Sequence, residues 1–120
     1  VRRVAVESLG QLASRGDAAV IATVSKELED SRWYQRVAAL QALGEMSERG
    51  HRMTILAVSE LLKDTDASVR TAAVEVLAKL ANSGDDRSVL AVRARQSDPD
   101  PAVREAAAKA VWLLTRSSDT

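Results

Sequence analysis

The chain has 120 residues, 46% of them hydrophobic, and its 17 basic and 17 acidic side chains cancel to a net charge of zero. The absence of cysteine excludes a disulfide framework and a thiolate metal site, and the absence of net charge removes the field that draws nucleic acid or an anionic membrane. No apolar run approaches the roughly 20 residues that a membrane helix needs, and no signal peptide is visible, so we expect a soluble, intracellular, cytoplasmic protein without membrane insertion.

An internal repeat of 34 residues organises the chain. The gapless copies are VRRVAVESLGQL at Val1, QRVAALQALGEM at Gln35, VRTAAVEVLAKL at Val69 and VREAAAKAVWLL at Val103. Arginine fills the second column of every copy and alanine fills the fifth. A fixed period of about 20 to 50 residues is typical of an array in which each unit is one supersecondary element. We therefore expect one repeat array with units near 1–16, 17–50, 51–84 and 85–120, forming a segment of a longer protein.

Two amphipathic helices are predicted in each complete unit. In the aligned copies, apolar residues at columns 1, 5, 9 and 12 fall on one helical stripe. A second apolar stripe follows, for example at Ile21, Val24 and Leu28. The sequence thus predicts an all-α chain of roughly seven helices, near residues 1–15, 18–30, 33–49, 52–64, 67–83, 86–97 and 101–116.

Aspartate, proline and glycine mark the expected helix ends. Side chains that could accept the first free amides of a helix stand at Asp17, Asp66, Asp85 and Asp100. Pro101 suits a first helical position, and the only histidine, His51, shares a column with Asp17 and Asp85. Glycine recurs in one column at Gly16, Gly50 and Gly84, where a left-handed residue without a Cβ would close the preceding helix.

Two segments resemble HEAT repeats: D-T-D-A-S-V-R-T-A-A-V-E-V-L from Asp64 to Leu77, and D-P-D-P-A-V-R-E-A-A-A-K-A-V from Asp98 to Val111. The resemblance covers the whole chain. It implies a right-handed α-α superhelix, or α-solenoid, of about three and a half hairpins. Each hairpin would pair an outer A helix with an inner B helix that opens with Val-Arg. The G-D turn and the Trp33–Tyr34 pair are similar to HEAT-like arrays related to bilin lyases.

The resemblance also implies a ladder between units, built from an aspartate at the end of helix A and the arginine six residues later. The matching pairs are Asp30 with Arg36, Asp64 with Arg70, and Asp98 with Arg104. An arginine buried between helix pairs needs its five donors satisfied, and a fixed aspartate offers a bidentate partner. We therefore interpret the arginine column as structural. A phosphate-binding stripe, the alternative, would not carry an acidic partner at constant spacing.

A partner is expected on the outward columns of the B helices, which line the concave side in the family. The candidate residues are Gln41, Glu45, Glu48, Glu75, Lys79, Lys109, Trp112 and Leu113. The middle of this face is acidic, which favours a partner with basic side chains, although each position could be an ordinary solvated residue. Trp112 replaces the small residues Gly44 and Ala78 of its column, and either caps the last contact between units or forms an exposed anchor with Leu113.

Catalysis, a cofactor and a metal site are not expected, because no catalytic constellation can be assembled. His51 has no second histidine to share a metal, and there is no glycine-rich phosphate loop or Ser-His-acid set. The sequence instead predicts a non-catalytic scaffold for protein–protein interaction, or a structural subunit of a larger assembly, with another protein as partner. Two alternatives remain: a HEAT-like lyase or chaperone-type subunit that handles a pigment or small ligand, and a nucleic-acid-binding protein, which the zero net charge disfavours.

Overall fold

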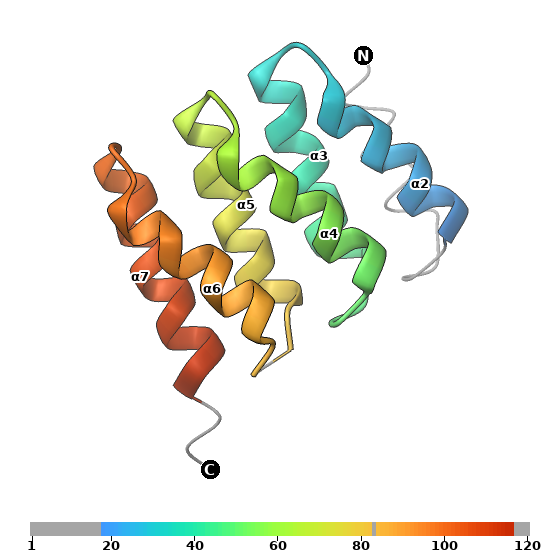
Figure 1. The fold of residues 1–120 in the computed structure, drawn as a ribbon. Coiled ribbons are helices and arrows are strands. Elements are labelled where there is room, and N and C mark those ends of the chain that lie inside the picture. The colour runs from blue at the N-terminus through green and yellow to red at the C-terminus, as the bar shows by residue number, and fades with distance from the viewer. Residues whose placement is uncertain (1–17, 83, 117–120) are drawn as a thin grey trace.

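The computed structural model describes residues 18–82 and 84–116, which form three helical hairpins side by side (Figure 1). The α-helices are α2 (Ala18–Lys26), α3 (Trp33–Met46), α4 (Arg52–Glu60), α5 (Ala67–Leu80), α6 (Asp86–Ala94) and α7 (Pro101–Thr115). A 3-10 turn prolongs each A helix, over Glu27–Glu29, Leu61–Lys63 and Arg95–Ser97. The all-helical repeat prediction is thus confirmed. The helix expected at 1–15, the cap at Asp17 and the turn at Gly16 lie outside the described residues.

The hairpins build two layers of helices. The A helices α2, α4 and α6 lie on one side of the array, and the B helices α3, α5 and α7 lie on the other (Figure 1). Within the B layer, α5 packs against both α3 and α7, and each A helix packs on the B helix of its own hairpin. We call the contact between consecutive hairpins a seam. The array therefore has one seam between α3 and α5 and a second between α5 and α7.

Aliphatic side chains fill the space between the layers. Fully buried examples are Leu40 and Leu43 on α3, Val58 on α4, Leu77 on α5 and Val92 on α6. Each large aliphatic side chain removed from water stabilises the fold by roughly 1.5–3 kcal/mol. The predicted apolar stripes are therefore the faces that the hairpins bury.

Capping residues begin the helices where the sequence predicts. Asp66, Asp85 and Asp100 accept backbone amides in the first turns of α5, α6 and α7. His51 does the same for α4, accepting the Thr54 amide at its ring Nδ1 over 3.3 Å. Pro101 takes the first position of α7. A side-chain acceptor at this position satisfies one of the amides that have no partner inside the helix.

The role expected of the glycines needs a correction. Gly50 has a φ of 82°, as the sequence predicts, but it does not close a helix. α3 already ends at Met46, because Ser47 adopts extended backbone with ψ of 147°. Gly50 instead turns the chain toward α4, and its amide donates to the Leu80 carbonyl over 2.6 Å. Gly84 repeats this φ of 82° after α5, which likewise ends early, at Leu80.

Candidate functional site: a groove across the B helices

On the B helices α3 and α5, an arginine joins its own hairpin to the next. Arg36 donates from Nε and Nη2 to the Asp64 carboxylate over 2.9 and 3.0 Å, and from Nη1 to the Asp30 carbonyl over 2.7 Å. Arg70 repeats this pattern with the Asp98 carboxylate, over 2.9 and 3.1 Å, and with the Asp64 carbonyl, over 2.8 Å. The two arginine side chains are only 13% and 14% exposed. Protein groups therefore occupy the donors that a phosphate would need.

The carboxylate partner differs from the expected one. The aspartate six residues before each arginine contributes its backbone carbonyl, whereas the carboxylate comes from the aspartate 28 residues after it. The Asp64 carboxylate also accepts the Asp66 amide over 2.9 Å. This bond holds the carboxylate toward the preceding hairpin, so Arg70 reaches only the carbonyl of Asp64. The ion pair consequently crosses the seam.

Asp98 is the most enclosed carboxylate of this ladder, with a fully buried side chain. Burial alone would raise its pKa, but hydrogen bonds from Arg70 and the Asp100 amide, with the charges of Arg70 and Arg95, lower the pKa below its ordinary value. Arg95 donates to Asp98 over 3.3 Å. The sequence interpretation missed Arg95, although its position three residues before Asp98 on the same segment could have indicated the contact.

Arg104 keeps only half of the ladder pattern. Its Nη1 donates to the carbonyls of Asp98 and Pro99 over 2.8 and 3.0 Å. Within residues 18–82 and 84–116, no carboxylate accepts from its Nε or Nη2. Accordingly, Arg104 is exposed, unlike Arg36 and Arg70.

Three adjoining hollows run along α3 and α5 on the outer side of the B layer, and we call them the B-face groove. The central hollow, about 400 Å³, is lined by Gln41, Gly44, Glu45, Ala72, Glu75, Val76 and Lys79. It shares Gly44 and Lys79 with a hollow of about 520 Å³ that also includes Glu48. It shares Gln41 with a hollow of about 220 Å³ beside Trp33 and Tyr34. A Cβ added at Gly44 would lie 3.5 Å from the Val76 side chain, at an ordinary contact distance.

Exposed carboxylates give the groove its charge. Glu45, Glu48 and Glu75 are all exposed, and none of them forms an ion pair with another described residue. The nearby cations are Lys79 and Arg49, and Arg49 already donates to the Ala81 carbonyl over 2.9 Å. A carbonyl carries no charge that would cancel the Arg49 guanidinium, so the lining of the groove holds three carboxylates against two cations and is acidic by one charge.

Trp33 and Tyr34 form the aromatic end of the groove. Their rings meet edge to face with centroids 5.9 Å apart, and they are 48% and 49% exposed. They stand in the first turn of α3 and line the small hollow together with Val37. An apolar side chain of a partner could pack there while its cations meet the carboxylates further along.

The remaining candidate residues lie away from this groove. Lys109, Trp112 and Leu113 are on α7, beyond the second seam. Trp112 is 58% exposed, and the Arg116 guanidinium lies 4.7 Å from its ring centroid. Among the described residues Trp112 is thus exposed, whereas Leu113 is half-buried.

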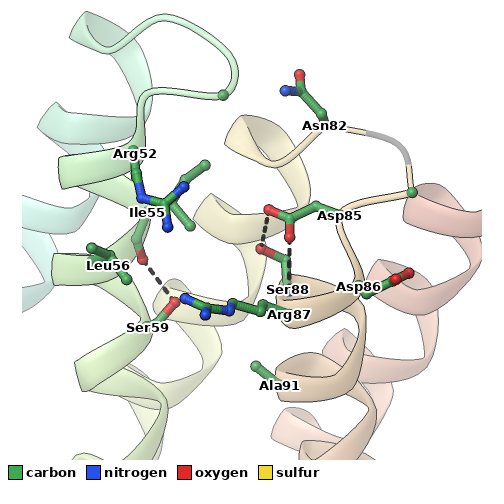
Figure 2. Close-up of a pocket in the computed structure, with 12 residues that line it drawn as sticks. Arg52, Ile55, Leu56, Ser59, Asn82, Asp85, Asp86, Arg87, Ser88 and Ala91 are labelled. Atoms are coloured by element: carbon green, nitrogen blue, oxygen red, sulfur yellow. Dashed lines mark hydrogen bonds between the residues drawn. The ribbon is translucent and has the colours of Figure 1, made fainter.

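A second groove, which the sequence interpretation missed, lies between the A helices α4 and α6. Figure 2 shows Arg52, Ile55, Leu56 and Ser59 on one side and Arg87, Ser88 and Ala91 on the other, around a volume of about 680 Å³. Leu56 is 48% exposed, and Leu90, one period later, is 67% exposed. The recurrence of leucine in this outward column could have indicated an apolar surface on the A helices. Asp85, at the mouth of the groove, is engaged by the Ser88 amide and hydroxyl.

The described residues hold few features of a chemical site. They contain no group of three or more His, Cys, Asp or Glu side chains that could hold a metal ion. Every buried side-chain nitrogen and oxygen described there has a hydrogen-bond partner. In the same part of the chain, no helix combines the length and apolar character needed to cross a membrane.

Comparison with known proteins identifies the repeat. A family model for HEAT repeats matches residues 21–112, which are more than half of the chain. The match begins in α2 and ends in α7, so it includes part or all of each described hairpin. A search of curated proteins found no match.

Proposed function

Because this chain belongs to the HEAT-repeat family, whose arrays are generally non-enzymatic scaffolds for protein interaction, we propose that it holds a polypeptide partner in the B-face groove. The observation that carries the proposal is the coincidence of adjoining hollows with three uncommitted carboxylates, Glu45, Glu48 and Glu75. Carboxylates outnumber the cations Lys79 and Arg49 in the lining of the groove, and a surface on which one sign predominates favours a partner of the opposite sign. The partner is therefore an extended segment with lysine and arginine side chains.

The aromatic end and the centre of the groove indicate which side chains the bound segment would carry. Trp33 and Tyr34 supply exposed rings at one end, and aromatic rings of this kind often dominate the binding energy of an interface. At the centre, Glu45 and Glu75 face a groove whose lining includes the small residues Gly44 and Ala72. A bound segment would place an apolar residue at the rings and its cations at the carboxylates.

The same charges disfavour the nucleic-acid alternative. Phosphate oxygens would meet Glu45, Glu48 and Glu75, and like charges opposed across an interface cost binding energy. Arg36 and Arg70 are engaged by Asp64 and Asp98 and do not compensate.

Selection of displayed random peptides on the 120-residue chain tests the proposal. We expect the selected peptides to be rich in lysine and arginine, and their affinity to fall steeply with added salt, because exposed charge pairs are screened. Combining Glu45→Lys with Glu75→Lys should weaken their binding by about tenfold or more. Enrichment of acidic peptides would contradict the proposed partner chemistry.

A matched control separates the groove from a general effect of charge. Combining Glu29→Lys with Glu60→Lys changes the net charge by the same amount, on exposed residues in the 3-10 turn that follows α2 and at the end of α4. The affinity of this double variant for the selected peptides should stay within about twofold of the affinity of the unchanged chain, because both substituted residues lie outside the groove. Equal losses in the two double variants would reject the B-face groove as the binding site.

A further inference from the structure

The groove between the A helices α4 and α6 lies on the layer opposite to the B-face groove (Figure 1). We call it the A-face groove. Its volume is about 680 Å³, and both of its helical walls belong to consecutive hairpins of the described array. The B-face groove uses no residue of this surface, so the two grooves are able to bind different partners.

Aliphatic side chains from both helices line the A-face groove. Ile55 on α4 and Ala91 on α6 are half-buried there, and Leu56 beside them is 48% exposed. The column of Leu56 holds only the methyl group of Ala22 in the preceding A helix, α2. An aliphatic surface that remains in contact with water is stabilised when a partner covers it.

Two guanidinium groups line the A-face groove without a counter-ion in contact. Arg52 and Arg87 are both exposed, and within residues 18–82 and 84–116 neither side chain forms a hydrogen bond or an ion pair. Figure 2 shows Arg87 extending from α6 toward α4, while Arg52 stands in the first turn of α4. A carboxylate that enters the groove would therefore meet donors that no described residue occupies.

The aspartates of the lining equal the arginines in number but differ from them in position. Asp85 caps α6 and accepts the Ser88 amide and hydroxyl over 3.4 and 3.0 Å. Asp86 points away from the groove in Figure 2. Both carboxylates stand at the N-terminal end of α6, where the helix dipole favours a negative charge. The lining is thus neutral in sum, but its positive charges extend into the groove and its negative charges belong to the start of one helix.

The repeat itself does not require these two arginines. Ala18 and Asp86 occupy the column of Arg52 in the other A helices, and Met53 occupies the column of Arg87 in α4. The arginines of the ladder, in contrast, recur in every unit. The charge pattern of the A-face groove is therefore separate from the interactions that hold one hairpin on the next.

We propose that the A-face groove binds an acidic amphipathic helix of another protein, independently of the B-face groove. The apolar stripe of this helix covers Leu56 and its aliphatic neighbours, as amphipathic helices do when they lie in an apolar groove. Carboxylates beside the stripe bind the guanidinium groups of Arg52 and Arg87, whose planar donors suit bidentate contacts. Helices α4 and α6 have 9 residues each and are about 13 Å long, so a partner helix of roughly three turns follows them.

The shape of the A-face groove disfavours other kinds of occupant. A small-molecule site encloses most of its ligand, whereas Leu56 leaves this groove open to water along one side. A lipid surface contacts side chains that protrude from a protein, whereas Ile55 and Ala91 are half-buried within a hollow. A helix enters such a hollow with its side chains and leaves its backbone outside.

Selection from a displayed library of helical peptides tests the proposal. Peptides of about 18 residues, long enough to form a helix, are first depleted of those that bind the variant with Arg52→Glu and Arg87→Glu and are then selected on the unchanged chain. Glutamate in the first turn of a helix is favourable, so this variant should keep its helical circular dichroism. We expect the selected peptides to combine Asp or Glu with aliphatic residues at helical spacing. No selected peptide, or peptides rich in lysine and arginine, would overturn the proposal.

A matched pair of double variants separates the two arginines from the general effect of charge. Lys63→Glu with Arg93→Glu changes the net charge as much as Arg52→Glu with Arg87→Glu does, on exposed residues outside the lining. Substitution of the groove arginines should weaken binding of the selected peptides by about tenfold or more, and the control by less than about threefold. Equal losses would reject the A-face groove as the binding site.

A second matched pair tests the apolar contact. Leu56→Ala should weaken binding of the selected peptides by about tenfold, because the leucine is covered by the bound helix. Met53→Ala, on the same helix and 70% exposed but outside the lining, should leave the affinity within about twofold. Equal effects of the two substitutions would mean that the peptides do not enter the groove.

Amide chemical shifts of the isotope-labelled chain locate the bound peptide. They should change on α4 and α6, and Glu45→Gln with Glu75→Gln should leave the affinity within about twofold, so that failure of one groove is visible separately from failure of the other. Shifts confined to α3 and α5 would overturn the proposal. So would binding of phosphatidylserine vesicles that Arg52→Glu with Arg87→Glu abolishes, which would assign the surface to a lipid. A dimer in sedimentation that the same double variant dissociates would assign the groove to a second copy of the chain.

Discussion

Arg70 and Asp98 are joined across the second seam by two hydrogen bonds, of 2.9 and 3.1 Å, although 28 residues separate them in the chain. Asp98 is fully buried and Arg70 is only 14% exposed. A buried ion pair contributes little compared with an apolar pair of the same shape, but removing one partner leaves a buried charge without compensation. The pair therefore makes the seam sensitive to substitution at either residue.

Arg70→Ala should lower the free energy of unfolding by about 3 kcal/mol, because Asp98 would stay buried with Arg95 as its remaining cationic partner. The exposed Lys63 provides the control, and Lys63→Ala should change the free energy by less than about 0.5 kcal/mol. Urea unfolding followed by circular dichroism measures both values. Equal midpoints for the two variants would show that Arg70 does not stabilise the seam.

Arg104→Ala should lower the free energy of unfolding much less than Arg70→Ala does, although both arginines occupy the same column. Arg104 loses only bonds to the Asp98 and Pro99 carbonyls, and exposed groups regain water, so we expect a loss of about 1 kcal/mol. The same urea experiment measures the difference. A loss as large as that of Arg70→Ala would mean that Arg104 has a carboxylate partner beyond the described residues.

Acid should weaken the second seam through Asp98. Its pKa is lowered in the fold from the ordinary value of 3.8, so its carboxylate contributes stability that is complete above that value. The contribution is lost as the pH falls from 3.8 toward the lower pKa of the folded state. In Asp98→Asn, the free energy of unfolding should be lower at pH 7 and should depend less on pH in this acidic range. If the free energy of unfolding depended on pH equally in the unchanged protein and in Asp98→Asn, Asp98 would not be the residue through which acid weakens the seam.

Gly44 should respond in opposite directions to a small and a large side chain. Gly44→Ala adds a Cβ at an ordinary contact distance of 3.5 Å from Val76 and removes the entropic cost of glycine within α3, so stability should rise by about 0.5–1 kcal/mol. Gly44→Leu should cost about 1–3 kcal/mol, because the added atoms press on α5. Thermal unfolding compares the two variants. Destabilisation by alanine would show that the seam is tighter than described.

The fold was predictable because several independent signals coincide in each unit. The 34-residue period predicts where each hairpin lies in the sequence, and the apolar stripes predict which faces of its helices are buried. Capping by Asp66, Asp85 and Asp100 placed the starts of the helices. The ends of α3 and α5 were harder to predict, because the residues that follow these helices, Ser47 and Ala81, are also buried. Burial continues past the end of the helix there, so hydrophobic pattern alone does not reveal the change of backbone.

The ladder partner could not be derived from spacing. Asp64 stands six residues before Arg70 and 28 residues after Arg36, and both separations recur through the chain. Only the packing of one hairpin on the next decides which atoms of the aspartate each arginine meets. The repeat pattern therefore identified the residue but not its carbonyl and carboxylate roles.

The candidate site was predictable in part for a related reason. Glu45 and Glu75 lie in outward columns of their helices, so their exposure follows from the helical period. The hollow between them depends on the distance between α3 and α5, and the groove beside Leu56 depends on the distance between α4 and α6. The exposure of Trp112 depends on what covers α7, which no pattern within α7 encodes.

The shared aspartates also have a mechanical consequence. The Asp64 carboxylate receives Arg36 while its carbonyl receives Arg70, and Asp98 connects Arg70 to Arg104 in the same way. An unbroken line of hydrogen bonds thus runs along the edge of the array where the A helices turn into the B helices. At the opposite edge, by the Gly50 and Gly84 turns, the described residues form no ion pair across a seam, and the bonds that cross the first seam there run from the Gly50 amide and from Arg49 to the backbone carbonyls of Leu80 and Ala81. A bending force should therefore open the glycine edge first, with the arginine edge acting as the hinge axis.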